Sequence, residues 1–380
     1  MTSKVNNKKK IFSITNEKFY NFIKLAIAIF LGLALAFIVL CLVSDDPVTA
    51  FITIVSGATK KPRYIGLVIE KFMPFVFAAL SYCILFKCGF FNLGGEGVVV
   101  ASGLVMSFAA CSETLSSLGN VLHPIICILI AALVGGCLML IPACLKAKFG
   151  ANELVLSLML NSAYMGIATY IIKYHFLSNS TSLIASPDFL ETCKVNYFPG
   201  EFCEKFHISP MLIFVIVATL IVYFVLYKTK LGYQIRLVGE NPKFANYTGI
   251  NSFKLSMITN FICGVLCGCG AACYLLTQAD YFQWTGNASS GIGFSGSMLA
   301  MLGQNNPIGA FIATFFIKYL EQGAIVLYYN DTSVPSEIIV IIEGAIVLLV
   351  SSTKFLRGLR EKKLLKEGLE SEYRNDREAK

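Results

Sequence analysis

The chain is poor in charged residues. Only 14% of its 380 residues are Asp, Glu, Lys or Arg, whereas 56% are hydrophobic. A soluble domain of ordinary composition carries about 25% charged residues. Several apolar runs also approach or exceed the roughly 17 to 25 residues with which a helix crosses a bilayer. The net charge of +8 comes from tails and loops and indicates no nucleic-acid partner. The composition predicts an all-α polytopic membrane protein.

Motifs for nucleotide chemistry are absent. No GxxxxGK[ST] occurs, so the chain cannot hold ATP phosphates in the P-loop manner, and ATP-driven work would need another subunit. The segment GIGFSG at 291–296 fits GxGxxG, but it follows no expected strand and opens no βαβ unit. The three histidines, His123, His175 and His207, are scattered and expected at the surface or the membrane interface. We expect no catalytic residues and no cofactor bound by this chain.

The 13 cysteines show no CxxC motif and no Cys/His spacing of the kind that binds zinc, so no metal site is expected. Most cysteines fall within apolar runs, where they serve as small buried hydrophobic residues. Cys193 and Cys203 differ because they share one polar loop. They could form a disulfide if that loop faces an oxidising compartment.

Apolar patterning gives ten candidate spans: 22–43, 72–87, 94–111, 122–144, 153–172, 210–227, 254–276, 291–303, 307–327 and 336–353. The first is too long for the core of a signal peptide and is expected to span. The third and eighth are weak and are expected to be broken or re-entrant. The resulting domains are a tail at 1–21, a transmembrane domain at 22–353 and a charged tail at 354–380.

Basic residues set the expected orientation. With both ends in the cytosol, the inner segments hold 22 Lys and Arg and the outer segments hold 7. The positive-inside rule therefore predicts N-in and C-in. The segment 228–251 is then cytosolic, and the loop 173–209 is external. Lys60, Lys61 and Arg63 break the trend and are expected in an amphipathic segment on the outer surface.

Ionisable and amide residues inside apolar runs are costly and therefore informative. Glu343 lies near the middle of the last span, where it would face a polar cavity or a hydrogen-bonded helix interface. Lys318 and Glu321, three residues apart, are expected to neutralise one another on one helix face. Asn161 would either join helices by hydrogen bonds or line a solute path.

FNLGGEG at 91–97 combines Asn92 and Glu96 with three glycines at a span entrance. Such segments can offer backbone groups to a solute while staying shielded from lipid. A tight turn between spans is the alternative.

The stretch KTKLGYQIRLVGENPKFANYTGI, Lys228 to Ile250, carries helix start and stop signals. Asn241 suits the N-cap, Pro242 the first helical position and Gly249 the left-handed residue after the last turn. Only about two turns lie between them, which is marginal for an isolated helix. The stretch predicts a short cytosolic helix that docks on a partner.

Four motifs resemble a known family, the permease subunits of bacterial ABC importers for nucleosides and simple sugars. They are FNLGGEG at 91–97, GANELVLSLMLN at 150–161, LGYQIRLVGENPKFANYTGIN at 231–251 and GIGFSGSMLAMLGQNNPIG at 291–309. Their order and spacing are similar to those of the family. Val98 departs from the usual Gln, and Lys243 and Phe244 stand where small residues are usual.

The resemblance implies a multi-pass permease of about ten helices in a bacterial cytoplasmic membrane. Its implied partners are a second permease, homologous or identical, a cytosolic ABC ATPase that binds the ATP, and an extracytoplasmic solute-binding protein. The segment 241–249 matches the coupling helix that contacts the ATPase, with contact residues at Gly239, Glu240, Asn241, Pro242, Phe244 and Tyr247.

The expected function is ATP-driven import of nucleosides, with simple sugars or a flavin-like vitamin left open. Candidate pathway residues are Asn92, Glu96, Asn161, Phe294 and Glu343. Phe294 and Trp284 could stack on a nucleobase or sugar face, although Trp284 would serve equally as an interfacial residue. An ion-coupled secondary transporter, with a membrane carboxylate as proton carrier, is the alternative.

Overall fold

The computed structural model describes residues 46–178, 184–277, 282–285 and 291–330, with positions 30, 33–34, 37–42 and 344. These residues are helices, turns and connecting segments, with one isolated bridge between Ala185 and Thr285 and no strand among them. They divide into two compact units, residues 56–323 and residues 1–55 with 324–380. For the described part, the all-α prediction is confirmed.

Six of the described helices are long and apolar enough to cross a membrane. They are α3 (Pro62–Lys87), α6 (Gly119–Phe149), α7 (Glu153–His175), α9 (Pro210–Lys228), α12 (Ser252–Thr277) and α14 (Pro307–Asn330). The expected first and last spans, 22–43 and 336–353, lie largely outside the described residues.

The remaining described helices are shorter. They are α2 (Pro47–Ser56), the 3₁₀ turn η1 (Gly57–Thr59), α4 (Gly95–Ala110), α5 (Glu113–Ser116), α8 (Glu201–Lys205), α10 (Lys230–Glu240), α11 (Pro242–Tyr247) and α13 (Ile292–Leu302). With 16 and 11 residues, α4 and α13 are short for a span, as the weak third and eighth segments predicted.

The beginning of α3 differs from the sequence prediction. The helix starts at Pro62 rather than at residue 72, because Lys61 is extended and Pro62 occupies the first turn. Arg63 is therefore part of this helix, and Lys60 follows η1 as its C-cap. The prediction of one amphipathic surface segment holding Lys60, Lys61 and Arg63 is therefore wrong for Arg63, which lies in the long apolar helix α3.

The core of the unit 56–323 is a close contact between α6 and α12. A Cβ atom added at Gly268 would lie 2.1 Å from the carbonyl oxygen of Ala131, and one at Gly264 would lie 2.2 Å from that of Gly135. Only glycine permits this approach of the two backbones. The GxxxG motif at 264–268 therefore packs helices, as membrane proteins commonly use it.

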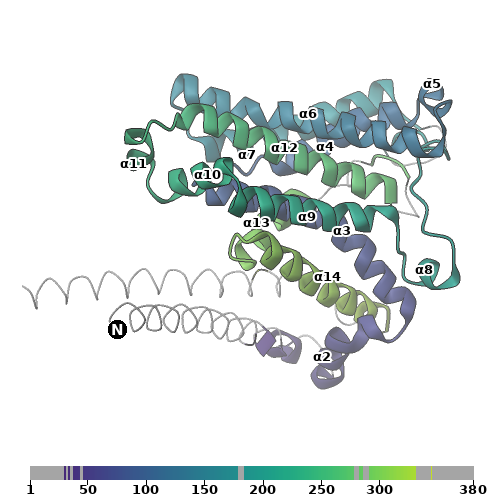
Figure 1. Ribbon diagram of the computed structural model, residues 1–380. Helices are drawn as coiled ribbons and strands as arrows, with labels where there is room; N and C mark the ends of the chain where they lie inside the picture. Colours follow the sequence, from purple (N-terminus) through teal and green to yellow (C-terminus); the bar gives the residue numbers. More distant parts are fainter. Residues whose placement is uncertain are drawn as a thin grey trace, which may run out of the picture. The chain divides into compact units, whose positions relative to one another are not determined.

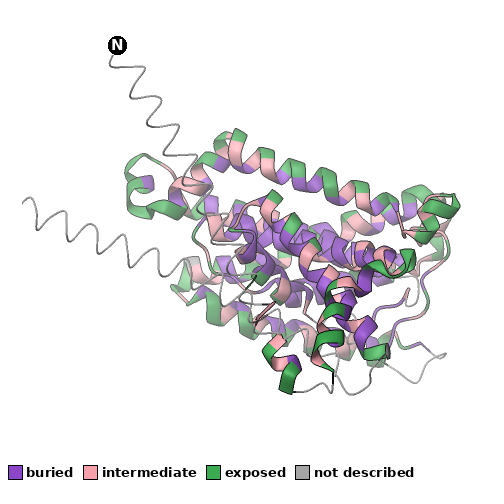
Figure 2. Cartoon of the chain, turned by 90° about the horizontal axis from the view of Figure 1, so that it is seen from below, coloured by how far each residue is buried: buried purple, intermediate pink, exposed green. Residues whose placement is uncertain are grey.

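Burial falls from the centre of this unit outward (Figure 2). Most of α3 and α12 is buried, whereas α7 and α9 are largely exposed and present large apolar side chains. Exposed apolar residues on these two helices include Val155, Met159, Ile167, Ile213, Val217, Ile221 and Phe224. An apolar surface of this extent is unusual for a soluble protein and suits contact with lipid.

The two ends of the unit carry different connections (Figure 1). The helices α10 and α11 lie at one end of the bundle, and α5 and α8 lie at the opposite end. The segments expected to be cytosolic and external are thus on opposite ends of the same bundle.

Candidate functional site

The start of α4 is held by side chains rather than by a preceding helical turn. The first amide groups of a helix have no partner within the helix and need one elsewhere. Asn92 Oδ1 accepts from the backbone nitrogen of Gly94 at 2.9 Å, and Tyr82 Oη accepts from that of Gly95 at 3.2 Å. Asn161 Oδ1 accepts from that of Gly97 at 2.9 Å. Side chains of this chain therefore satisfy three amide groups at the FNLGGEG break.

The helix α7 supports the same break from the side. Asn161 Nδ2 donates to the carbonyl oxygen of Leu93 at 2.9 Å, and Ser157 Oγ accepts from the Leu93 nitrogen at 3.0 Å. Asn161 thus binds both a carbonyl and an amide group of the broken segment. Of the two roles proposed for Asn161, this geometry is that of an interhelical hydrogen-bonding residue.

Glu96 joins the two short helices. Its carboxylate accepts from the backbone nitrogens of Gly291 at 2.8 Å, Gly293 at 2.7 Å and Phe294 at 3.3 Å. These amides open α13, where a negative charge is also favoured by the helix dipole. The helices α4 and α13 therefore begin side by side, with a carboxylate of one capping the other.

Glycine makes this junction possible. A Cβ atom at Gly293 would lie 2.2 Å from the backbone nitrogen of Glu96. Gly291, the N-cap of α13, has φ +93°, a left-handed conformation that a residue with a side chain rarely adopts. GIGFSG therefore serves close backbone approach, and no strand of the kind that a dinucleotide-binding motif requires lies in the described part of the chain.

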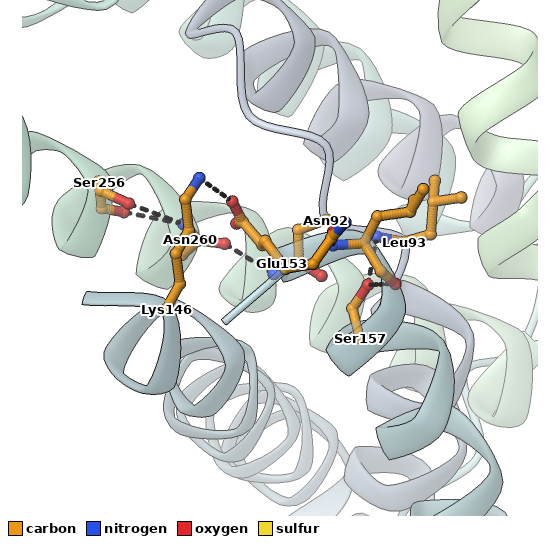
Figure 3. A network of polar contacts seen from close by, with 9 residues as sticks. Asn92, Leu93, Lys146, Glu153, Ser157, Ser256 and Asn260 are labelled. Carbon is orange, nitrogen blue, oxygen red and sulfur yellow. Dashed lines mark hydrogen bonds and ion pairs between the residues drawn. The ribbon is translucent and has the colours of Figure 1, made fainter. Parts of the chain in front are cut away.

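A second polar network extends from the break toward α6 and α12 (Figure 3). Asn92 Nδ2 donates to Asn260 Oδ1 at 2.9 Å, and Asn260 Nδ2 donates to the carbonyl oxygen of Ser256 at 3.0 Å. Beside it, Lys146 Nζ and Glu153 Oε2 form an ion pair of 2.6 Å. The pair ties the last turn of α6 to the first turn of α7, whose N-cap is Asn152.

The candidate pathway residues differ sharply in exposure. The exposed fractions are 0% for Asn92, 7% for Glu96, 8% for Asn161 and 39% for Phe294. The first three face backbone groups of this chain, whereas Phe294 presents free surface at the start of α13. Glu343 lies outside the described residues.

Trp284 is not free to stack on a solute in this structure. It is 2% exposed, and its Nε1 donates to the carbonyl oxygen of Val100 in α4 at 3.1 Å. Its backbone also exchanges hydrogen bonds with Ser186. Trp284 therefore joins two connecting segments to α4, and neither role expected from the sequence describes it.

The Lys318–Glu321 prediction is confirmed. Lys318 Nζ lies 2.6 Å from Glu321 Oε2, and the same ammonium lies 3.3 Å from the centre of the Phe75 ring. The lysine is almost fully buried. These contacts compensate a charge that would otherwise be costly within an apolar helix bundle.

The segment 230–250 contains the predicted short helix. Asn241 Oδ1 accepts from the backbone nitrogen of Phe244 at 3.1 Å, Pro242 occupies the first turn, and Gly249 has φ +80°. All three helix signals are thus confirmed. The preceding helix α10, which the sequence analysis did not predict, is capped by Thr229, whose Oγ1 accepts from Gly232.

The helix α11 buries one face and exposes the other. Ala245 is fully buried, whereas Phe244 is 51% exposed and Tyr247 is 90% exposed. Two aromatic side chains on a helix of 6 residues at one end of the bundle form a small apolar surface. Such a surface suits a partner protein.

Gly239 couples this end of the bundle to α3. A Cβ atom at Gly239 would lie 2.0 Å from the carbonyl oxygen of Lys87, the last residue of α3. Gly89, with φ +76°, lies against Gly239 from the other side of the turn. The helix α10 therefore meets the end of α3 backbone to backbone.

The expected disulfide is absent, and one histidine prediction is wrong. Cys193 and Cys203 are both free, because Cys193 is buried beside Cys127, with 3.5 Å between the two sulfur atoms. His123 is fully buried rather than at the surface.

Sequence reasoning missed the partners of the predicted residues. Tyr82 and Asn260, which lie in none of the four motifs, and Ser157, which lies within GANELVLSLMLN but was not singled out, complete the hydrogen bonds of the break. Asn260 was the one with a visible signal, since it is a lone amide within an apolar run.

Comparison with known proteins adds the relatives. Nucleoside ABC transporter permease protein NupB of Lactococcus lactis is 27% identical, over 87% of this chain and 90% of its own length. Guanosine ABC transporter permease protein NupP of Bacillus subtilis is 28% identical, over 89% and 96%. Glucose ABC transporter permease protein TsgB13 of Haloferax volcanii is 24% identical, over 87% of each. No solved structure matches the chain.

The family comparison covers the same region as the four motifs. Residues 64–351 match the model of the branched-chain amino acid transport system / permease component family. This range contains the α4 break, the start of α13 and the helix α11. The match gives the ion-coupled alternative no support. Because it spans well over half of the chain, the protein belongs to this family of transport permease components.

Proposed function

We propose that the chain is the membrane-spanning permease of an ATP-driven importer and that its solutes are nucleosides. The relatives NupB and NupP, named as nucleoside and guanosine permeases, align with nearly their whole lengths. Relatives named as glucose and riboflavin permeases align less closely, at 24% and 23% identity. Nucleosides are therefore favoured over sugars and flavins.

The observation that carries the ATP-driven reading is the geometry of α11. The helix is capped at both ends, buries Ala245 and exposes Phe244 and Tyr247. Such a helix is too short to be stable by itself in water. A docking partner at this end explains why two aromatic residues are exposed there, and a cytosolic ATPase would be that partner.

The remaining partners follow from the same proposal. A second permease subunit completes the pathway, and an extracytoplasmic binding protein delivers the solute at the end that carries α5 and α8. The orientation is N-in and C-in, which 22 Lys and Arg in the inner segments against 7 in the outer segments support. The location is the cytoplasmic membrane of a bacterium.

Solute passes near the junction of α4 and α13 in this proposal. Phe294 offers an exposed ring at that junction, and aromatic rings stack favourably on planar bases. Asn92, Glu96 and Asn161 keep the backbone of the junction in shape, and Glu343 is a further candidate for the pathway. ATP binding and hydrolysis on the partner would switch the pathway between outward-facing and inward-facing states.

The proposal is tested by co-purification and uptake. The tagged protein is isolated from its native membrane in mild detergent, as wild type, as Phe244→Ala/Tyr247→Ala and as Phe202→Ala. Phe202 is 67% exposed on α8 at the opposite end and is the matched control. An ATPase that co-purifies with wild type and control but not with the double variant supports the proposal. Equal recovery in all three contradicts it.

The solute is tested separately, in cells that lack other nucleoside uptake. Expression of the full transporter should restore uptake of labelled guanosine or another nucleoside, and unlabelled glucose and riboflavin should not compete. Competition by glucose or riboflavin instead of nucleosides would reassign the solute while leaving the ATP-driven reading in place.

A further inference from the structure

Three metal-binding side chains meet at one buried point, away from the α4–α13 junction and from α11. One ring nitrogen of His123 and the sulfur atoms of Cys127 and Cys193 all lie within 4.8 Å of one another. All three residues are fully buried. His123 and Cys127 are four residues apart on α6 and share a face, and Cys193 comes from the connecting segment before α8.

We propose that His123, Cys127 and Cys193 form a structural zinc site. Zinc in proteins is bound by thiolate sulfur and imidazole nitrogen, almost always in tetrahedral geometry. The three residues supply two sulfurs and one nitrogen, and the fourth position is open to water or another ligand.

The distance between the sulfur atoms fits a shared metal. Two thiolates bound to one zinc at about 2.3 Å in tetrahedral geometry have sulfurs about 3.8 Å apart. The observed separation of Cys127 and Cys193 Sγ is 3.5 Å. Two disulfide-bonded sulfurs lie about 2.05 Å apart, so the two sulfur atoms would have to move closer to form a disulfide. A disulfide would also not explain why His123 lies beside them.

One nitrogen of the imidazole is held by the backbone. His123 Nε2 lies 3.0 Å from the carbonyl oxygen of Ala109, which can only accept, so Nε2 carries the proton. Nδ1 therefore presents its lone pair. A histidine whose second nitrogen donates to a backbone carbonyl is the usual arrangement around protein-bound zinc.

The group now facing Nδ1 is the hydroxyl of Thr192. Thr192 Oγ1 lies 2.9 Å from Nδ1 and also 3.1 Å from Ser116 Oγ. Zinc binds imidazole nitrogen at about 2.0–2.1 Å, so a metal on Nδ1 would take the place of this hydroxyl, and the Thr192 side chain must rotate aside when the metal binds.

Charge favours zinc over a monovalent soft metal. Two thiolates and one Zn²⁺ sum to zero, and the imidazole is neutral. A fully buried site tolerates a neutral complex far better than a net charge. The metal would join α6 to the segment around Cys193, and His123 would connect both to the end of α4 through Ala109. Backbone hydrogen bonds already hold this segment, from Leu190 to Ala110 and from Val195 to Leu276.

The test uses the whole protein, purified in detergent under reducing conditions and measured for metal content after incubation with zinc and removal of the excess. The expected result is about one zinc per chain in the wild type and in Cys137→Ser, and near none in Cys127→Ser/Cys193→Ser. Cys137 is an exposed cysteine on the same helix and is the matched control. Zinc retained by the double variant overturns the proposal.

A second measurement needs no substitution and so does not depend on a variant that folds. The wild type is alkylated with and without a zinc chelator, and modified cysteines are mapped by mass spectrometry. Chelation should expose Cys127 and Cys193 together while leaving Cys137 unchanged. Equal labelling in both conditions, or a Cys127–Cys193 disulfide in protein isolated without reductant, overturns the zinc assignment.

Discussion

The carboxylate of Glu96 lies 2.7 Å from the backbone nitrogen of Gly293, so the first turn of one short helix caps the start of another. The two residues are 197 positions apart in the chain. Their contact fixes the junction of α4 and α13. Four of the five candidate pathway residues lie at this junction, namely Asn92, Glu96, Asn161 and Phe294. The fifth, Glu343, lies outside the described residues.

Removing the Glu96 carboxylate should destabilise the fold. Glu96→Ala leaves the amides of Gly291, Gly293 and Phe294 without an acceptor, and each buried unpaired donor costs about 1–3 kcal/mol. Glu96→Gln keeps one acceptor oxygen and should lose less. Thermal unfolding in detergent measures the difference, with exposed Glu113→Ala on α5 as control. Equal unfolding temperatures for Glu96→Ala and the control would contradict this role.

Asn161 should be required for folding rather than only for solute recognition. Asn161→Leu leaves the backbone nitrogen of Gly97 without its acceptor and the carbonyl oxygen of Leu93 without its donor. The first hydrogen bond is buried and the second is part-buried. We expect a loss of about 1–3 kcal/mol for each group left unpaired. Met159→Ala, at an exposed position of the same helix, should have a small effect on the unfolding temperature. If Asn161→Leu and Met159→Ala have the same unfolding temperature, Asn161 does not stabilise the broken segment.

Gly268→Ala should separate α6 from α12. The added methyl group would lie 2.1 Å from the Ala131 carbonyl oxygen, so a backbone must move. Gly166→Ala on α7 is the matched control, since no atom lies within 4 Å of the added carbon. Alanine there should be neutral or favourable by up to about 1 kcal/mol, given its higher helix propensity. Yield and unfolding temperature of the two variants provide the comparison.

The cap of α11 should matter for coupling but not for insertion. Asn241→Ala/Pro242→Ala removes the acceptor for Phe244 N and should cost about 1 kcal/mol of local helix stability. We expect normal amounts of protein in the membrane and reduced ATP-driven uptake. Hydrogen exchange at residues 241–248 checks that the helix is loosened. Full uptake with a loosened helix would separate α11 from coupling.

Gly239→Ala should affect the same step by another route. A methyl group 2.0 Å from the Lys87 carbonyl oxygen would push α10 off the end of α3. The exposed residues of α11 remain intact, so the ATPase should still bind while uptake falls. Co-purification and uptake are measured on one preparation, with Gly166→Ala again as control. Loss of ATPase binding and uptake together would place Gly239 in the docking surface instead.

The sequence was most informative where local chemistry determines structure. The cap, the proline and the terminal glycine of α11 each act within a few residues, and the structure shows all three as expected. The Lys318–Glu321 pair is likewise a local, one-helix relationship. The weak third and eighth segments are short helices because their glycines and polar residues interrupt the apolar pattern.

Long-range pairings could not be predicted from pattern. Nothing in FNLGGEG indicates that Glu96 caps a helix far along the chain, or that Asn161 serves the same break. A shared loop makes a disulfide between Cys193 and Cys203 conceivable, yet the neighbour of Cys193 in space is Cys127 on α6. The span expected at 72–87 begins earlier, at Pro62, because proline suits the first turn of a helix even where hydropathy is low.

The capped junction also restricts how the permease can move. If α4 and α13 separated, a carboxylate and three amide groups would lose one another in a water-poor interior, where unmet polar groups are expensive. Switching between outward-facing and inward-facing states is therefore expected to turn both helix starts together as one rigid body. The hinges would then lie beyond the far ends of α4 and α13. A solute that passes the junction would contact the same backbone geometry in both states, while the surrounding helices open to one side of the membrane or the other.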